Sequence, residues 1–154
     1  MNSPAPGLEL VFTLRAQLGA PIVLGRFGEG VRRIIPVAGG TFEGPEIQGR
    51  ILPAGADYQL IHADGFTEID ARYALETDQG ETIWVRNTGM RHGPPELIAK
   101  LNAGQPVDQS QIYFRTAPVF DTASPRLEWM RRSLFVCVGE RYPNEVVIRF
   151  YLVG

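Results

Sequence analysis

The sequence predicts an all-β protein, a single antiparallel β-barrel of about nine or ten strands with one or two short helices. Segments in which apolar and polar residues alternate recur along the chain, and this alternation is typical of strands that bury one face. The 154 residues include 17 glycines and 12 prolines, many of which separate these segments as turns. Only one segment has convincing helical periodicity, so a fold of alternating strands and helices is not expected.

The clearest strand covers residues 8–18, where leucines and Phe12 alternate with polar residues. Residues 31–37 predict a second strand because β-branched residues dominate there. Pro36 cannot donate a ladder hydrogen bond, which indicates an edge, a bulge or a strand end. The glycine-rich segments 25–30 and 39–45 are interpreted as a hairpin loop and a turn. Further short strands are predicted at 46–52, 57–62, 66–77 and 82–88, with Asp64-Gly65 as a tight hairpin between two of them.

The convincing helix follows Gly93. Pro94 and Pro95 suit a first helical turn, apolar residues recur at helical spacing as far as Leu101, and Gly104 can end the helix. This helix is short, and we expect it to plug or cover an opening of the barrel. The remaining predicted elements are strands at 112–118, 134–141 and 145–153 and a turn of helix within 125–132.

Length and composition predict one domain over residues 1–154, with residues 1–7 as an N-terminal tail. Fifteen basic and 17 acidic side chains leave a net charge of -2, and no basic stripe suits a phosphate backbone, so nucleic acid is not an expected partner. Cys137 is the single cysteine, which excludes an internal disulfide and is compatible with a cytoplasmic protein. No signal-like start and no apolar run of about 18 residues is present, so neither secretion nor a membrane partner is expected.

Several segments resemble known functional motifs but lack the neighbouring residues or elements that those motifs require. The loop at 39–45 lacks the Lys-Ser/Thr pair of a phosphate loop, and the glycines at 25–30 lead into a strand instead of a helix. His62 and His92 lie far apart in the sequence, and neither has a second histidine or a cysteine at a ligand spacing. No serine lies in a nucleophile elbow. The sequence therefore predicts neither a metal site nor a cofactor.

Charged residues on the predicted strands leave two arrangements open. If Tyr73 and Leu75 face inward, Arg72 and Glu76 form a charged ladder in solvent. If Arg72 and Glu76 face inward, they must be paired, because an isolated buried charge costs several kcal/mol. Arg115 poses the same choice. An interior arginine among tyrosines would be a receptor for a carboxylate, phenolate or enolate oxygen.

Five short motifs carry a resemblance to a known family: Gly39-Gly40-Thr41-Phe42-Glu43-Gly44-Pro45, Gly55-Ala56-Asp57-Tyr58, Ala71-Arg72-Tyr73, Asp78-Gln79-Gly80 and Tyr113-Phe114-Arg115. With these motifs the chain resembles DUF3237, also called UPF0311, a family of small bacterial and fungal β-barrel proteins. The resemblance runs from about Arg33 to Val138. It implies a single antiparallel barrel and marks Asp57, Arg72 and Arg115 as site residues without giving them roles. Tyr58 replaces a frequent tryptophan, which affects the expected ligand more than the fold.

Three functions follow as hypotheses. The first is a barrel that binds a small apolar or aromatic ligand with an anionic or carbonyl oxygen. The second is a cofactor-independent isomerase or cyclase in which Asp57 or Glu76 is the general base. The third is a filled barrel that acts through a partner or as a homodimer, joined at exposed strand edges. The ligand-binding residues expected under the first are Arg33, Glu43, Tyr58, Arg72, Tyr73, Phe114 and Arg115.

Overall fold

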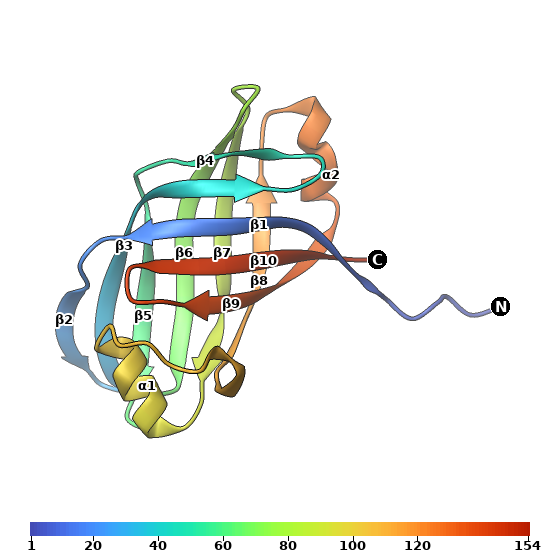
Figure 1. Ribbon diagram of the computed structural model, residues 1–154. Coiled ribbons are helices and arrows are strands. Elements are labelled where there is room, and N and C mark those ends of the chain that lie inside the picture. The colour runs from blue at the N-terminus through green and yellow to red at the C-terminus, as the bar shows by residue number, and fades with distance from the viewer.

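The computed structural model describes residues 1–154 and confirms the predicted fold class (Figure 1). Eight strands close an antiparallel barrel in the order β1-β10-β9-β8-β7-β6-β4-β3 and back to β1. Outside this ring, β5 pairs with β3 and β6, and β2 pairs with β3 alone. The strands are β1 (Leu8–Leu18), β2 (Ile22–Phe27), β3 (Gly30–Glu43), β4 (Gln48–Ile51), β5 (Ala56–His62), β6 (Thr67–Thr77), β7 (Thr82–His92), β8 (Tyr113–Asp121), β9 (Leu134–Arg141) and β10 (Glu145–Val153).

Two short helices complete the fold. Helix α1 (Pro95–Asn102) confirms the predicted helix, and α2 (Glu128–Arg131) follows a 3₁₀ turn at Pro125–Leu127. Another 3₁₀ turn lies at Gln109–Gln111. The structure contains no helix of the length and hydropathy needed to cross a membrane. Residues 1–7 extend away from the barrel as an exposed tail (Figure 1).

The predicted turn at residues 39–45 is wrong in its first half, because β3 continues through both glycines to Glu43. Gly39 and Gly40 have φ angles of 137° and 136°, a region that favours glycine. Up to Pro36 β3 pairs with β2 and β5, and from Val37 onward it pairs with β1 and then also with β4. The two glycines directly follow this change of neighbours and continue the strand, although their composition is typical of a turn.

Pro36 lies inside β3, at the point where the neighbouring strand changes. The register with β2 reaches Ile34, and the register with β1 begins at Val37. Between them the amide of Gly19 donates to the carbonyl oxygen of Pro36 at 2.9 Å. The backbone nitrogen of a strand residue points to the same side as its carbonyl, so Pro36 faces this junction and interrupts no regular ladder.

The interpretation of residues 25–30 as a hairpin loop is correct only at its centre, because β2 extends to Phe27 and β3 begins at Gly30. Only Gly28 and Glu29 separate Phe27 from its partner Gly30. The strand escapes a pattern-based prediction because Ile22, Val23 and Leu24 are consecutive apolar residues. All three are exposed, as expected for a strand that lies outside the closed ring.

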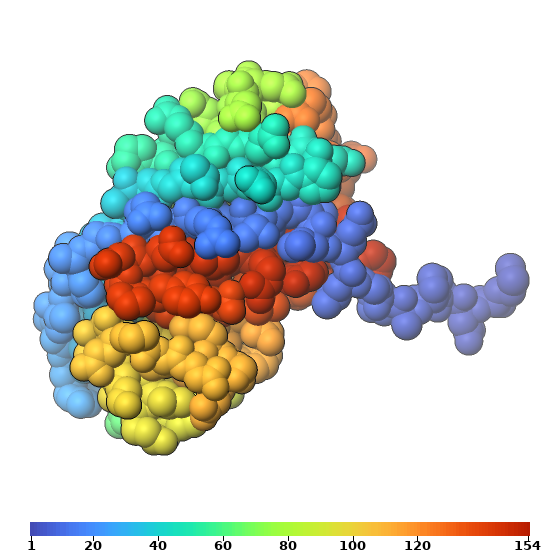
Figure 2. Space-filling model, viewed as in Figure 1, coloured from blue at the N-terminus to red at the C-terminus, as the bar shows by residue number.

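The interior of the barrel divides into two regions. A core of 19 buried residues, including the stacked rings of Phe12 and Phe150 at 4.2 Å, fills much of it. A smaller cluster joins Ile98 and Leu101 of α1 to residues of β6 and β8. Figure 2 shows the segment that carries α1, in yellow and gold, closing the barrel next to β9 and β10 in red. This arrangement agrees with the expectation that the helix covers an opening.

Candidate ligand-binding cavity

A cavity of about 50 Å³ lies inside the barrel. Every strand except β2 contributes to its wall, and 12 of the 18 lining residues are hydrophobic. A buried water needs a cavity of about 10–15 Å³, so this cavity has room for a few waters or a small organic group. Apolar walls with a few polar groups are typical of small-molecule sites.

Several polar groups on this wall lack a regular hydrogen bond. Four buried side-chain atoms, Tyr73 Oη, Asn87 Oδ1, Arg91 Nε and Thr116 Oγ1, have no partner at hydrogen-bond geometry, although Tyr73 lies near Asn87 and Thr116 near Cys137. All four belong to residues that line the cavity. A buried polar group without a partner costs about 1–3 kcal/mol. Their concentration at one cavity therefore indicates a place where bound molecules would supply the missing partners.

Arg91 and Asp57 give the cavity charges of opposite sign, with Arg91 fully buried and Asp57 partly buried. Arg91 is 1% exposed, and burial lowers its pKa to about 10 although Asp57 opposes the shift. Burial likewise raises the pKa of Asp57 above its usual range. The Asp57 carboxylate accepts hydrogen bonds from Gln59 Nε2 at 2.7 Å and from the amide of Asp70 at 3.1 Å. These bonds and the nearby arginines limit the rise.

Arg33 extends the network to helix α1. Its Nε and Nη2 donate to Gln59 Oε1 at 3.1 and 3.0 Å, and its Nη1 donates to the carbonyl oxygen of Asn102 at 3.1 Å. Arg91 Nη2 also donates to Asn102 Oδ1, at 3.2 Å. The last residue of α1 is therefore held by two arginines, one of which lines the cavity.

The electrostatic balance of this region is positive. Arg33, Arg91 and Arg141 lie close enough to interact with one another and with the single carboxylate of Asp57, and burial lowers the pKa of each arginine. An excess of guanidinium groups in a low-dielectric region favours an anionic or strongly polar oxygen. Burial also raises the pKa of Tyr73, so its phenol stays protonated and can donate.

The structure brings together four of the residues predicted for the site. Asp57, Tyr73 and Phe114 line the cavity, and Arg33 is joined to Asp57 through Gln59. The Arg91 guanidinium lies 5.3 Å from the centre of the Phe114 ring. These contacts give Phe114 the aromatic wall expected of it.

The other five predicted residues lie outside the cavity. Inward-facing Tyr73 and Leu75 place Arg72 and Glu76 on the outer face, where Arg72 pairs with Asp70 and Glu76 with Arg50. Tyr58 is exposed, and Arg115 lies over the exposed ring of Tyr113. Glu43 is exposed at the end of β3. Of the two arrangements left open by the sequence, the solvent-facing ladder is the one present.

Sequence reasoning did not select several polar residues of the network: Gln59, Asn87, Arg91, Asn102, Thr116 and Arg141. The alternation of apolar and polar residues in β7 indicates that Arg91 faces inward. Ile83, Val85 and Asn87 face inward, and two more steps of the same period reach Arg91. The predicted strand ended at Thr88, before Gly89. That glycine is required inside the strand, since a Cβ there would lie 2.2 Å from the carbonyl oxygen of Arg115.

Comparison with known proteins gives a consistent family. Residues 6–153 match the sequence model described as a protein of unknown function, DUF3237. A UPF0311 protein from Rhodopseudomonas palustris is 44% identical over 151 residues, which cover 98% of this chain and 99% of the relative. A crystal structure of a conserved protein of unknown function from the same species has a TM-score of 0.95 at 44% identity, covering 99% of this chain and 100% of that one.

Two further solved structures share the fold. A β-barrel-like protein from Acinetobacter baumannii is 38% identical, with a TM-score of 0.87 and 99% coverage of both chains. A structure described as an enzyme from Penicillium herquei has a TM-score of 0.74 at 17% identity, covering 100% of this chain and 98% of that one. The second likeness shows a common fold alone.

Proposed function

The chain belongs to the DUF3237 family of proteins of unknown function, and we propose that it binds a small, largely apolar ligand with an anionic or carbonyl oxygen inside the barrel. The observation that carries this proposal is the gathering of four unpartnered polar atoms on the wall of one apolar cavity. The excess of buried guanidinium groups selects an oxygen acceptor over a cation.

The unpartnered atoms also indicate which polar groups the ligand should carry. Arg91 Nε can only donate, whereas Asn87 Oδ1 can only accept. Tyr73 and Thr116 carry hydroxyls that do either. A ligand that satisfies this set carries an acceptor oxygen and a hydroxyl close together, as in a small hydroxy acid, an enol or a phenolic acid. Apolar residues such as Leu14 and Ile148 would contact the rest of the molecule.

Small aromatic and aliphatic carboxylates are the first probes, with the neutral amide of each as its control. Thermal shift identifies binders, and calorimetry then measures their dissociation constants. We expect Tyr73→Phe to weaken carboxylate binding about tenfold, since a hydrogen bond to a charged group contributes about 1.5–3 kcal/mol. The same variant should keep or raise the melting temperature without ligand, because it removes a buried hydroxyl that has no partner.

Arg72→Ala is the matched control, because Arg72 lies on the same strand with its side chain on the outer face. It should bind the probes as the wild type does. Thr116→Val offers a second, nearly isosteric change on the cavity wall. Unchanged affinity in both Tyr73→Phe and Thr116→Val would contradict binding in this cavity.

A second candidate function is base catalysis at the same place. Asp57 lines the cavity with Tyr73 and Arg91, and burial raises the pKa of its carboxyl group. A carboxylate with a raised pKa is a stronger base, and the donors of Tyr73 and Arg91 could stabilise an enolate oxygen. The reaction class would be an isomerisation or cyclisation that begins with removal of a proton next to a carbonyl group.

Deuterium exchange tests this candidate without a known product. Bound carbonyl compounds that carry an acidic C–H should exchange that proton in D₂O faster with the wild type, as followed by proton NMR. Exchange should rise with pH as Asp57 ionises, and Asp57→Asn should abolish the acceleration. Glu76→Gln is the control, because Glu76 faces outward and pairs with Arg50. Acceleration that survives Asp57→Asn would remove Asp57 as the base.

A further inference from the structure

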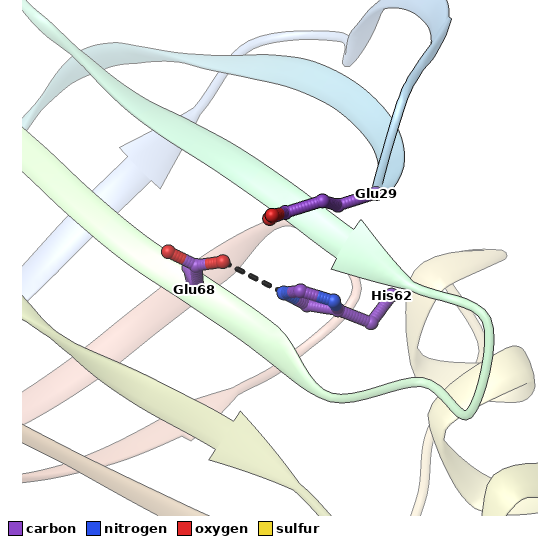
Figure 3. A group of neighbouring side chains, drawn as sticks. All are labelled: Glu29, His62 and Glu68. Atoms are coloured by element: carbon purple, nitrogen blue, oxygen red, sulfur yellow. Dashed lines mark hydrogen bonds and ion pairs between the residues drawn. The ribbon is translucent and has the colours of Figure 1, made fainter.

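A second group of polar side chains lies outside the barrel. None of its members lines the cavity, and two of the three are exposed. Glu29 from the β2–β3 turn, His62 at the end of β5 and Glu68 near the start of β6 point toward one another (Figure 3). One ligand atom from each lies within 4.8 Å of the other two. His62 Nε2 is 2.7 Å from Glu68 Oε2. Three separate elements therefore bring one imidazole and two carboxylates together.

The fold holds these three residues in place by strand pairing. Gly30 pairs with His62, which places the β2–β3 turn above the end of β5. Glu68 pairs with Leu60, two residues before His62. A Cβ at Gly30 would lie 2.3 Å from the carbonyl oxygen of Ile61, so the two backbones approach closely here. The ring of Phe66 packs edge-on against His62 at 5.7 Å and limits the rotation of the imidazole.

The group carries two carboxylates that no arginine or lysine neutralises. Neither glutamate forms an ion pair with an arginine or a lysine, and the single ionic contact is the one between Glu68 and His62. By contrast, Asp70, Glu76 and Glu81 each pair with an arginine. Two carboxylates gathered without such a partner repel each other, and a divalent cation between them would remove this repulsion.

We propose that Glu29, His62 and Glu68 bind a divalent transition-metal ion of the zinc class. An imidazole nitrogen with carboxylate oxygens is a donor set that suits Zn²⁺, whereas Mg²⁺ and Ca²⁺ prefer oxygen alone. Zinc bonds of about 2.0–2.2 Å place neighbouring ligand atoms roughly 3.3 Å apart. Both glutamates are exposed, so we expect their oxygens to reach this spacing by rotamer changes when the ion binds, with solvent supplying a fourth ligand.

Local spacing in the sequence did not predict this site. Asp64 lies two residues after His62 but accepts from the amide of Phe66 in the hairpin turn and is not part of the cluster. The nearest carboxylate of the cluster, Glu68, is six residues away across that hairpin. Glu29 is brought in by the pairing of β3 with β5, which joins residues about 30 positions apart. The prediction of no metal site rested on local spacing, whereas these ligands converge through tertiary pairing.

Zinc titration of the full chain, without an affinity tag and after treatment with a chelator, tests the proposal. We expect one Zn²⁺ per chain by calorimetry, with affinity at least tenfold weaker in His62→Ala and weaker in Glu29→Gln and Glu68→Gln. Copper(II) should give an electron paramagnetic resonance signal coupled to one imidazole nitrogen, and His62→Ala should remove that coupling. His92→Ala and Glu43→Gln are the controls, since these exposed residues lie outside the cluster.

Circular dichroism and melting temperature show that each variant is folded, which these exposed positions should allow. The proposal is overturned if the wild type binds no Zn²⁺, or if His62→Ala binds as tightly as the wild type. It is equally overturned if His92→Ala causes the same loss, or if Mg²⁺ displaces Zn²⁺ at equal concentration.

Discussion

Replacing Arg91 with methionine should lower the free energy of unfolding by about 1.5–3 kcal/mol, because it removes a fully buried cation that attracts the Asp57 carboxylate and donates to Asn102 Oδ1. Methionine reproduces the apolar stem of arginine without the guanidinium group, so the change removes the charge and keeps the packing of the stem. The Asp57 carboxylate would keep its hydrogen bonds to Gln59 and Asp70 but lose the attraction of a fully buried cation. Urea unfolding measures the loss.

A double-mutant cycle with Asp57→Asn separates charge from packing. Asp57→Asn combined with Arg91→Met removes both charges, and we expect the pair to recover at least 1 kcal/mol relative to the sum of the single changes. Recovery should be incomplete, because Arg33 also interacts with Asp57 and because Asn102 loses the bond from Arg91. Additive single changes would show that Arg91 and Asp57 are not coupled.

Arg91 links the cavity to the helix that covers it. Its Nη2 contacts Asn102 at the end of α1, while its Nε faces the cavity without a partner. Arg33 donates to the same asparagine, at its carbonyl oxygen and at Oδ1. A ligand that binds Arg91 would therefore contact the same guanidinium group that is hydrogen-bonded to the end of α1. Binding and the position of this helix are connected through one guanidinium group.

The predicted fold depended on local patterns, and these patterns were sufficient for most strands. Alternation of apolar and polar residues is a property of each strand by itself, so β1, β6, β9 and β10 were located within a few residues. The same alternation indicates which face of β6 is buried, because Ile69, Tyr73 and Leu75 share the inner face. The motif containing Arg72 drew attention to the outer face instead.

The candidate site was less predictable because its members meet across the barrel. Asp57 on β5 and Arg91 on β7 are separated by β6, and no local period relates them. Glycine posed a different problem. Gly39 and Gly40 have the composition of a turn, yet they serve a strand whose neighbours change. Distinguishing these cases requires knowledge of which backbone lies opposite each glycine.

Gly40→Ala should lower the free energy of unfolding by about 3–5 kcal/mol, the combination of an unfavourable φ for alanine and a steric clash. A Cβ at this position would lie 2.1 Å from the carbonyl oxygen of Arg15. Relief requires β1 and β3 to move apart where they close the barrel. Urea unfolding measures the effect.

Gly39→Ala separates these two causes, because Gly39 has nearly the same φ. A Cβ there would meet nothing closer than the carbonyl oxygen of Ile51 at 3.8 Å. We therefore expect a loss of only about 1–3 kcal/mol, from the backbone conformation alone. The difference between the two variants measures the close approach of β1 to β3. Equal losses would mean that backbone conformation, and not this approach, requires glycine at position 40, and that the barrel can close here with more space between the strands.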